Sequence, residues 1–161
     1  MNFESFEDIK VLMDNFDPAS LLPDLSTMAG TVATVTRLAV LAGPIVLLTL
    51  GLLYLFLAPK EANYHFGYRC YFGMGSEEAW RFTQRIAGVL WAGLGLVLTL
   101  LMLFISLSYG SKDISQVIDS GLKCLIWEVV LTALSCLAIN AAVMLRYDRK
   151  GLRRSDLNSD L

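Results

Sequence analysis

The sequence has few charged residues, a single histidine and no catalytic motif. Charged side chains make up 17% of the 161 residues, whereas a soluble domain usually carries about a quarter. The three cysteines, Cys70, Cys124 and Cys136, lack the CxxC spacing of a zinc site or a disulfide framework. His65 has no metal-ligand neighbours in the sequence, and GxSxG, P-loop and HExxH patterns are missing. We therefore expect neither an enzyme nor a metal or cofactor site, and the net charge of -2 gives no sign of a nucleic-acid partner.

Apolar residues, by contrast, are abundant and fall into three long runs. Hydrophobic residues make up 55% of the chain, and the mean hydropathy is +0.56. The runs are residues 38–58, 86–109 and 124–145. About 20 helical residues cross a hydrocarbon core of about 30 Å, and lipid offers no partner for the backbone of an open strand. The sequence predicts an all-α, three-helix transmembrane bundle over residues 38–145, with an N-terminal extension (1–37), a loop (59–85) and a polar tail (146–161).

Lysine and arginine predict the orientation of these spans. The loop between the first two spans and the tail together hold nine basic residues, and the other two flanking segments hold four. Short cytoplasmic segments are the ones enriched in basic residues, and three crossings place the loop and the tail on the same side. We therefore expect the N-terminus outside and the C-terminus in the cytoplasm.

The extension before the first span has the pattern of an amphipathic helix. Its apolar residues recur at helical spacing, namely Phe3, Phe6, Ile9, Leu12, Met13 and Phe16. Much of the opposite face is acidic (Glu4, Glu7, Asp8 and Asp14), unlike the lysine-rich helices that bind anionic lipid. The sequence leaves open whether this helix lies on the membrane or covers the protein's own spans.

The loop between the first two spans is rich in aromatic residues and arginine. It reads Asn63-Tyr64-His65-Phe66-Gly67-Tyr68-Arg69 and then Ser76-Glu77-Glu78-Ala79-Trp80-Arg81-Phe82. Gly67 permits a backbone turn that a side chain would forbid. Ser76 is a good N-cap, and Glu77 stands four residues before Arg81 in the favourable acid-first order. We predict a helix that begins near Glu77 and continues into the second span, with Trp80 at the membrane interface.

Two interpretations of this loop remain open. In one, Tyr64, Phe66, Tyr68 and Trp80 form an aromatic belt at headgroup depth, with arginines as anchors, and the residue pattern alone favours it. In the other, the loop is a binding or structural site. Its candidate residues are Phe66, Gly67, Tyr68, Arg69, Glu77, Glu78, Trp80 and Arg81.

The pattern N-Y-x-F-G-Y-R, followed by S-E-E-A-W-x-F and G-x-L-W, resembles the SdpI family of small bacterial membrane proteins. The segment Met144-Leu145-Arg146-Tyr147-Asp148-Arg149-Lys150-Gly151 resembles the family's ending after the last span. The resemblance covers about residues 58–151. Cys70 stands where the family usually has threonine, and Met74-Gly75 replaces the more common methionine-lysine. A proline-threonine-glutamate of the last span is missing, with Asn140 near its place.

The resemblance implies a multi-pass protein of the bacterial cytoplasmic membrane that gives immunity to, or senses, a secreted membrane-active peptide toxin. Its partners would be the lipid bilayer, the toxin or a cytoplasmic regulator. The segment Phe66-Gly67-Tyr68-Arg69 would be fixed against the second span, with Arg69 held by Glu77, Glu78 or a lipid phosphate. The alternative function is an accessory or structural subunit of a transporter or another membrane complex, because the resemblance does not cover the N-terminal extension.

Polar residues inside the spans are few. Glu128 is the only charged residue within them. Intramembrane carboxylates are costly and often functional, as in a small channel, but a structural pair with Arg37 is an equally good interpretation. Asn140 is a candidate for interhelical hydrogen bonding. Small residues that permit close helix approach, within the bundle or in a homo-oligomer, are Gly88, Ala92 and Gly95.

Overall fold

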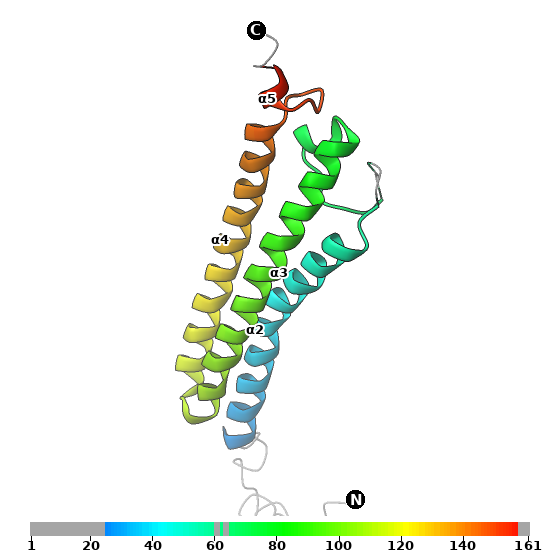
Figure 1. Ribbon diagram of the computed structural model, residues 1–161. Coiled ribbons are helices and arrows are strands. Elements are labelled where there is room, and N and C mark those ends of the chain that lie inside the picture. The colour runs from blue at the N-terminus through cyan, green and yellow to red at the C-terminus, as the bar shows by residue number, and fades with distance from the viewer. Residues whose placement is uncertain (1–24, 60–61, 63–64, 158–161) are drawn as a thin grey trace, which may run out of the picture.

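The computed structural model describes residues 25–59, 62 and 65–157, which form three long helices, with a loop between the first two and a short turn between the last two (Figure 1). The long helices are α2 (Leu25–Phe56), α3 (Glu77–Leu107) and α4 (Ile114–Arg146). The short elements are η2 (Phe72–Met74), η3 (Ser108–Ser111) and α5 (Arg154–Leu157). No strand occurs among the described residues, so the predicted all-α bundle is confirmed. The predicted amphipathic helix of the N-terminal extension lies outside the described residues.

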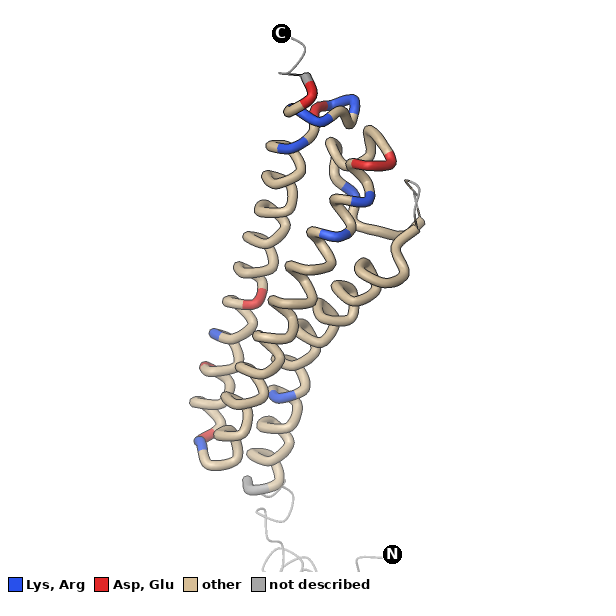
Figure 2. Tube along the Cα trace, viewed as in Figure 1, with Lys and Arg blue, Asp and Glu red and all other residues tan. Residues whose placement is uncertain are grey.

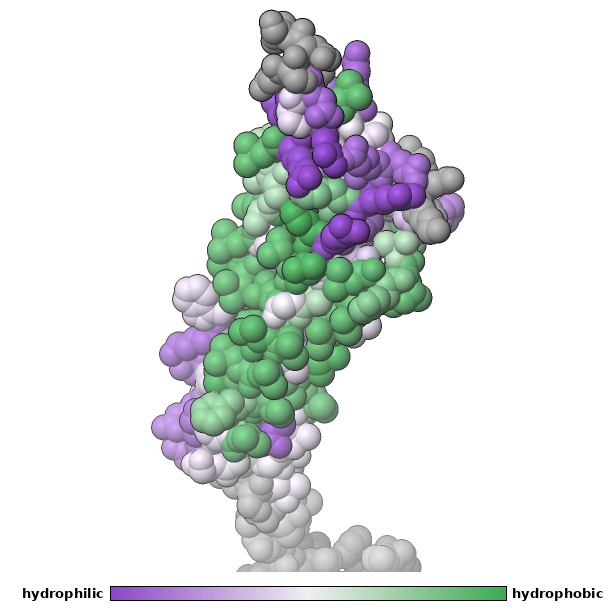
Figure 3. Space-filling model, viewed as in Figure 1, coloured by the Kyte–Doolittle hydropathy of each residue, from purple (hydrophilic) through white to green (hydrophobic). Residues whose placement is uncertain are grey.

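The three long helices form the membrane domain. All of them are long and apolar enough to cross a bilayer, and on the face shown in Figure 3 the middle of the bundle is mostly hydrophobic. They contain 32, 31 and 33 residues, or about 45–50 Å each at 1.5 Å per residue. A hydrocarbon core is only about 30 Å thick. The helices therefore begin before the predicted spans, and their ends extend beyond the lipid tails.

Charged residues gather toward the ends of the bundle. Figure 2 shows them most densely around α5, the end of α4 and the start of α3, with few along the middle of the helices. This distribution is expected for a bundle that crosses a bilayer, because a charge at the centre of the hydrocarbon is costly. The chain is therefore a membrane protein.

Helices α2 and α3 pack closely because glycine removes the side chains where their backbones meet. A Cβ on Gly95 would overlap the backbone of Leu48, and a Cβ on Gly51 would overlap the backbone of Ala92. A Cβ on Gly88 would lie 3.0 Å from the carbonyl oxygen of Gly51. Small residues permit this approach in membranes, where van der Waals packing stabilises helix pairs. Gly88, Ala92 and Gly95 thus serve packing within the bundle.

The buried core has two parts, one at each end of the helices. The part near η3 is formed by Ala33, Val40, Leu98, Met102, Tyr109, Val117 and Cys124. The part near α5 is formed by Leu47, Ala79, Ala87, Trp91, Ile139, Val143 and Tyr147. The groove described below is lined by residues of both parts, Leu98 from the first and Leu47 and Trp91 from the second.

Candidate functional site

The first turn of α3 is anchored by its N-cap. The Ser76 hydroxyl accepts a hydrogen bond from the backbone N–H of Ala79 at 3.1 Å. Glu77 forms an ion pair with Arg81 one turn later. Both features agree with the predicted helix start at Glu77, where acidic side chains favour the helix dipole.

Trp80 is enclosed by the loop that precedes α3. Its side chain is fully buried, and its indole Nε1 donates to the carbonyl oxygen of Pro59 at 2.9 Å. The backbone at Gly67 lies against the indole, and its φ is +120°. A Cβ at this position would lie 2.7 Å from the Cζ2 atom of Trp80. The aromatic-belt interpretation is therefore wrong for Trp80, because the buried face of α3 carries this residue under the loop.

Gln84 holds the loop by its backbone. Its side-chain Oε1 accepts from the N–H of Tyr68 at 2.8 Å, and its Nε2 donates to the carbonyl oxygen of Tyr68 at 2.7 Å. Only 3% of Gln84 is exposed. An amide that satisfies both polar groups of one residue mimics the pairing of a β-strand, so it fixes the position and the direction of the chain at Tyr68.

Phe66 and Tyr68 point toward the helices. The Phe66 ring meets the Tyr54 ring edge-on with centroids 5.8 Å apart, and the Tyr68 ring meets Trp91 in the same way at 5.4 Å. The Tyr68 hydroxyl donates to the carbonyl oxygen of Cys136 on α4 at 3.3 Å. These two rings therefore connect α2, α3 and α4, while Tyr64 lies outside the described residues.

Asn140 lies one turn after Cys136 on α4 and interacts with the Tyr68 hydroxyl. Burial is the largest effect on this phenol and raises the pKa of Tyr68 to about 12. The neighbouring Cys136 thiol acts in the same direction, and the hydrogen bond from Asn140 acts against it. Asn140 was predicted to form a hydrogen bond between helices, and the contact it makes is with Tyr68 of the loop.

The segment after α4 folds back onto the start of α3. Ser76, besides capping the helix, donates its hydroxyl to the carbonyl oxygen of Gly151 at 2.7 Å. Gly151 has φ of +75°, and a Cβ on Gly75 would lie 2.6 Å from its nitrogen. The loop motif and the tail motif, far apart in the sequence, therefore form one unit. We call it the cap and define it as residues 65–84 and 144–154.

Charged and aromatic contacts complete the cap. Glu78 forms an ion pair with Arg153 and accepts a hydrogen bond from the Tyr147 hydroxyl at 3.4 Å. Hydrogen bonds with Tyr147 and Glu78 raise the pKa of the Arg153 guanidinium above its ordinary value. The Arg146 guanidinium lies over the Phe82 ring, 4.5 Å from its centroid. Apart from the contact between Arg153 and Tyr147, these contacts join the end of α4 or the tail to the start of α3.

Arg69 has a different environment from the one expected. Its side chain is exposed, and no carboxylate of the described residues lies within ion-pair distance of it. Glu77 instead pairs with Arg81 and Glu78 with Arg153. The expectation that Glu77 or Glu78 holds Arg69 is therefore wrong, because a partner on the same helix and one on the tail take both carboxylates. Contact with a lipid phosphate stays a prediction.

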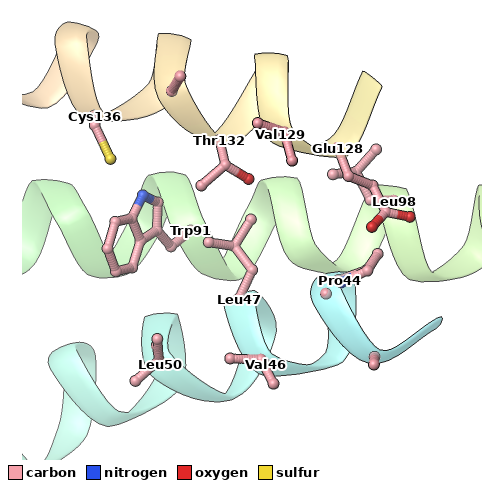
Figure 4. A pocket seen from close by; sticks show the side chains of 13 residues that line it. Pro44, Val46, Leu47, Leu50, Trp91, Leu98, Glu128, Val129, Thr132 and Cys136 are labelled. Atoms are coloured by element: carbon pink, nitrogen blue, oxygen red, sulfur yellow. The ribbon is translucent and has the colours of Figure 1, made fainter. Parts of the chain in front are cut away.

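A groove of about 650 Å³ opens between α2 and α4, with α3 as its floor (Figure 4). Its walls are mostly apolar and include Val46, Leu47 and Leu50 from α2, Trp91 and Leu98 from α3, and Val129 from α4. The groove spans residues 128–136 of α4, or about 12 Å along the helix axis. It lies wholly within the membrane-spanning part of the bundle.

Glu128 forms one end of this groove. It is 6% exposed, and its Oε1 has no hydrogen-bond partner among the described residues. A Cβ on Gly43 would lie 2.7 Å from Oε2, so glycine leaves the room that the carboxylate occupies. Arg37 instead donates to the carbonyl oxygen of Ser106 at 3.0 Å. The interpretation of Glu128 as a pair with Arg37 is wrong, because the guanidinium binds this carbonyl at the end of α3 instead.

The opposite end of the groove is closed by a hydrogen bond between helices. The indole Nε1 of Trp91 donates to the Ser135 hydroxyl at 3.0 Å, and both side chains are buried. Ser135 in turn donates to the carbonyl oxygen of Thr132 at 2.7 Å. The groove is thus an apolar channel between a tryptophan that is fully hydrogen-bonded and a carboxylate that is not.

Residues 60–145 match the SdpI/YfhL protein family. The chain belongs to the SdpI family. The matched residues contain the loop, all of α3 and nearly all of α4, so the resemblance seen in the motifs is confirmed. No curated protein and no solved structure gives a significant match to the chain.

The motifs of this SdpI-family chain pointed to the cap but did not reveal all the contacts that hold it together. Gln84 lies outside the motifs, and Trp91 was part of the G-x-L-W motif but was given no contact, although these residues follow Trp80 by four and eleven positions and share its helix face. All three are buried. The signal that could have identified Gln84 was its place on the same helix face as two large aromatic residues, Trp80 and Trp91. Ser135 carried no comparable signal, because an isolated serine in an apolar helix is common.

The site of this SdpI-family protein combines a rigid cap with a membrane groove. Within the described part of the chain, no three side chains from His, Cys, Asp and Glu are placed to hold a metal ion. The groove presents one carboxylate in apolar surroundings, which suits an apolar ligand that brings its own hydrogen-bond donor. The arrangement therefore supports binding at the membrane.

Proposed function

We propose that this membrane protein gives its bacterial host immunity to a secreted membrane-active peptide toxin, or reports the presence of that toxin. The observation that carries the proposal is membership of the SdpI family, in which immunity and toxin-triggered signalling are the characterised roles. The lipid-facing groove supports it, because it offers a binding place to a molecule that is already dissolved in the bilayer.

We propose further that the protein lies in the cytoplasmic membrane with its N-terminus outside. The support is the distribution of lysine and arginine, nine around the cap against four elsewhere. With this orientation the cap faces the cytoplasm and the η3 turn faces outward. Fusing a reporter that is active only in the cytoplasm after Leu161 tests the orientation, and an inactive C-terminal fusion with an active N-terminal one would reverse it.

With this orientation, the groove and the cap would have different binding partners. Glu128 lies five residues beyond Lys123, or about 7 Å deeper along α4. Lys123 is exposed and pairs with Asp119, as suits a position near the outer surface. The groove would meet a toxin that enters the outer leaflet, and the cap would present a fixed surface to a cytoplasmic regulator.

We also propose that the protein works by binding and not by catalysis. Its two intramembrane polar candidates, Glu128 and Asn140, are about 18 Å apart along the axis of α4. Two groups that act on one substrate by acid–base chemistry need to lie within hydrogen-bond reach of the same atoms. This distance supports two separate uses, one in the groove and one beneath the loop.

Survival of the host tests the proposal. A strain that lacks the gene is exposed to culture supernatant from its own kin, with and without the gene restored. We expect the restored gene to protect, at a membrane abundance measured by immunoblot. Equal survival of both strains would contradict immunity, and an unchanged transcriptional response to the supernatant would contradict sensing.

The predicted role of Arg69 is tested in the same assay. Because Arg69 is exposed and pairs with no described carboxylate, its replacement should leave the fold intact. We expect Arg69→Ala to reduce protection, whereas Arg85→Ala, at an exposed arginine outside the cap, should not. If both variants protect as well as the wild type at equal abundance, Arg69 has no part in the function.

Purification discriminates the rival proposal of an accessory subunit. Stoichiometric recovery of unrelated membrane proteins with the detergent-solubilised chain would favour that proposal. Recovery of the chain alone, as a monomer or homo-oligomer, would count against it and leave immunity or sensing as the better explanation.

A further inference from the structure

The groove between α2 and α4 has a chemistry that specifies its ligand. We propose that it binds an apolar, membrane-inserted peptide segment that carries one lysine or arginine, with the basic group paired to Glu128. This inference rests on the proposed function and deepens it, because it assigns a binding site and a recognition feature to the toxin. Nothing in the cap is required for this contact.

The state of Glu128 is the first argument. A buried carboxylate in a membrane is costly unless it is paired, yet Oε1 has no partner among the described residues. The nearest cation on α2, Arg37, donates to the Ser106 carbonyl and forms no ion pair with Glu128. Figure 4 shows the carboxylate at the groove, beside Leu98 and Pro44. A positive group from a ligand would supply the missing partner.

The shape of the groove is the second argument. It is about 12 Å long and runs from Glu128 to Cys136, away from the η3 end and toward the membrane centre. Glu128 itself lies about 7 Å below Lys123. A peptide helix that enters from the η3 side would place about two turns of apolar side chains along the groove. A lysine on its outer turns has an apolar stem long enough to reach Glu128 with its ammonium group.

Charge and depth exclude two simpler occupants. Residues 1–24 of the chain carry six acidic residues and one lysine, so their net charge repels Glu128. A lipid ammonium group resides at headgroup depth, above the position of Glu128, whereas a lysine side chain can descend from a peptide backbone within the membrane. A basic peptide is therefore the occupant that satisfies both the charge and the depth.

A two-by-two binding experiment tests the pairing. The full-length protein is placed in phosphatidylcholine nanodiscs after the exposed Trp127 of α4 has been changed to Phe. The probe is a synthetic leucine–alanine peptide of about 20 residues with one lysine in its outer turns and a nitroxide label two turns deeper. Binding is read as quenching of Trp91, which lines the groove. A second peptide has norleucine in place of lysine, which keeps the apolar stem and removes the charge.

We expect Glu128→Gln to weaken binding of the lysine peptide about tenfold, as for one charged hydrogen bond in a membrane, and to leave the norleucine peptide unchanged. The norleucine result also shows that the variant is folded. Asp156→Asn, at an exposed carboxylate outside both the groove and the cap, should change binding of neither peptide, and Thr132→Phe, which fills the groove, should weaken binding of both. Equal loss for both peptides with Glu128→Gln, or no loss for either, would overturn the proposal.

The failure of this proposal can be told apart from failure of the proposed function. If deleting the gene removes protection but Glu128→Gln protects fully, the groove is not the toxin site and the immunity proposal stands. If the gene never protects but Glu128→Gln weakens binding of the lysine peptide alone, the groove binds basic peptides and the immunity proposal is wrong. If phosphatidylethanolamine nanodiscs abolish the preference for lysine, a lipid ammonium occupies the site and the peptide proposal is wrong.

Discussion

Replacement of Gln84 by leucine tests whether the loop is held by two hydrogen bonds to one residue. Leucine has nearly the same volume and stays apolar, so the change leaves packing largely intact. It removes the partners of the Tyr68 N–H and carbonyl groups, which now lie 2.8 and 2.7 Å from the amide. A buried polar group that loses its partner costs about 1–3 kcal/mol. Because Tyr68 is only half-buried and water can reach part of it, we expect a total loss of about 2–3 kcal/mol.

Two measurements check this expectation. Unfolding by sodium dodecyl sulfate in mixed micelles, followed by tryptophan fluorescence, gives the change in unfolding free energy. Hydrogen exchange read by mass spectrometry gives the opening of the loop, and the Tyr68 amide should exchange about thirtyfold faster or more. Arg85→Leu is the matched control, since Arg85 is the exposed neighbour of Gln84 on the same helix, and it should change stability by less than about 0.5 kcal/mol.

The reasoning would be refuted by a specific result. If Gln84→Leu unfolds within about 0.5 kcal/mol of the wild type and the Tyr68 amide stays protected, the two hydrogen bonds do not hold the loop. The ring contact of Tyr68 with Trp91, at 5.4 Å, would then be the interaction that fixes it.

Three further changes test other contacts. Gly67→Ala places a side chain at φ of +120° and against Trp80, so we expect a loss of about 2–3 kcal/mol in the same unfolding assay, and an unchanged midpoint would contradict this role of the turn. Gly95→Val should separate α2 from α3 and cost about 2 kcal/mol or more, whereas Gly93→Ala, whose Cβ would meet nothing within 4 Å, should cost nothing, and equal effects would show that close approach does not matter. Burial raises the pKa of Tyr68 from 10.0 to about 12, so its contribution to stability is complete below pH 10 and falls as the pH rises toward 12. Tyr68→Phe should remove this part of the pH dependence in unfolding titrations, and an identical profile for both proteins would refute it.

Much of the fold was predictable because it rests on local properties. The apolar runs predicted three helices, since lipid leaves the backbone no other partner. The helix start at Glu77 followed from Ser76 and the spacing to Arg81. Gly88 and Gly95 were predicted to permit close approach, and both lie where α3 meets α2. The wrong expectations concerned which groups meet across the structure: Arg69 with Glu77 or Glu78, Arg37 with Glu128, and Trp80, which packs under the loop and not at the membrane interface.

The candidate site was predictable only in part. The loop motif and Glu128 drew attention by composition, because aromatic residues beside arginine and a charge within a span are both unusual. The partners of these residues come from other elements. Gln84 reaches back to the loop, Gly151 arrives from the tail, and the groove is formed by residues of α2, α3 and α4 together. No spacing within one segment encodes such contacts.

The sequence by itself determined that this protein crosses the membrane as three helices, where α3 begins, and to which family it belongs. These features depend on hydrophobicity, capping and motifs, which act over a few neighbouring residues. Only the tertiary structure decided that the loop and the tail form one cap, that Trp80 is buried beneath it, and that Glu128 faces a groove where its Oε1 has no hydrogen-bond partner among the described residues. The physical reason is that each of these depends on how the helices are rotated and packed against one another, which is settled by the fit of whole faces and not by any one segment.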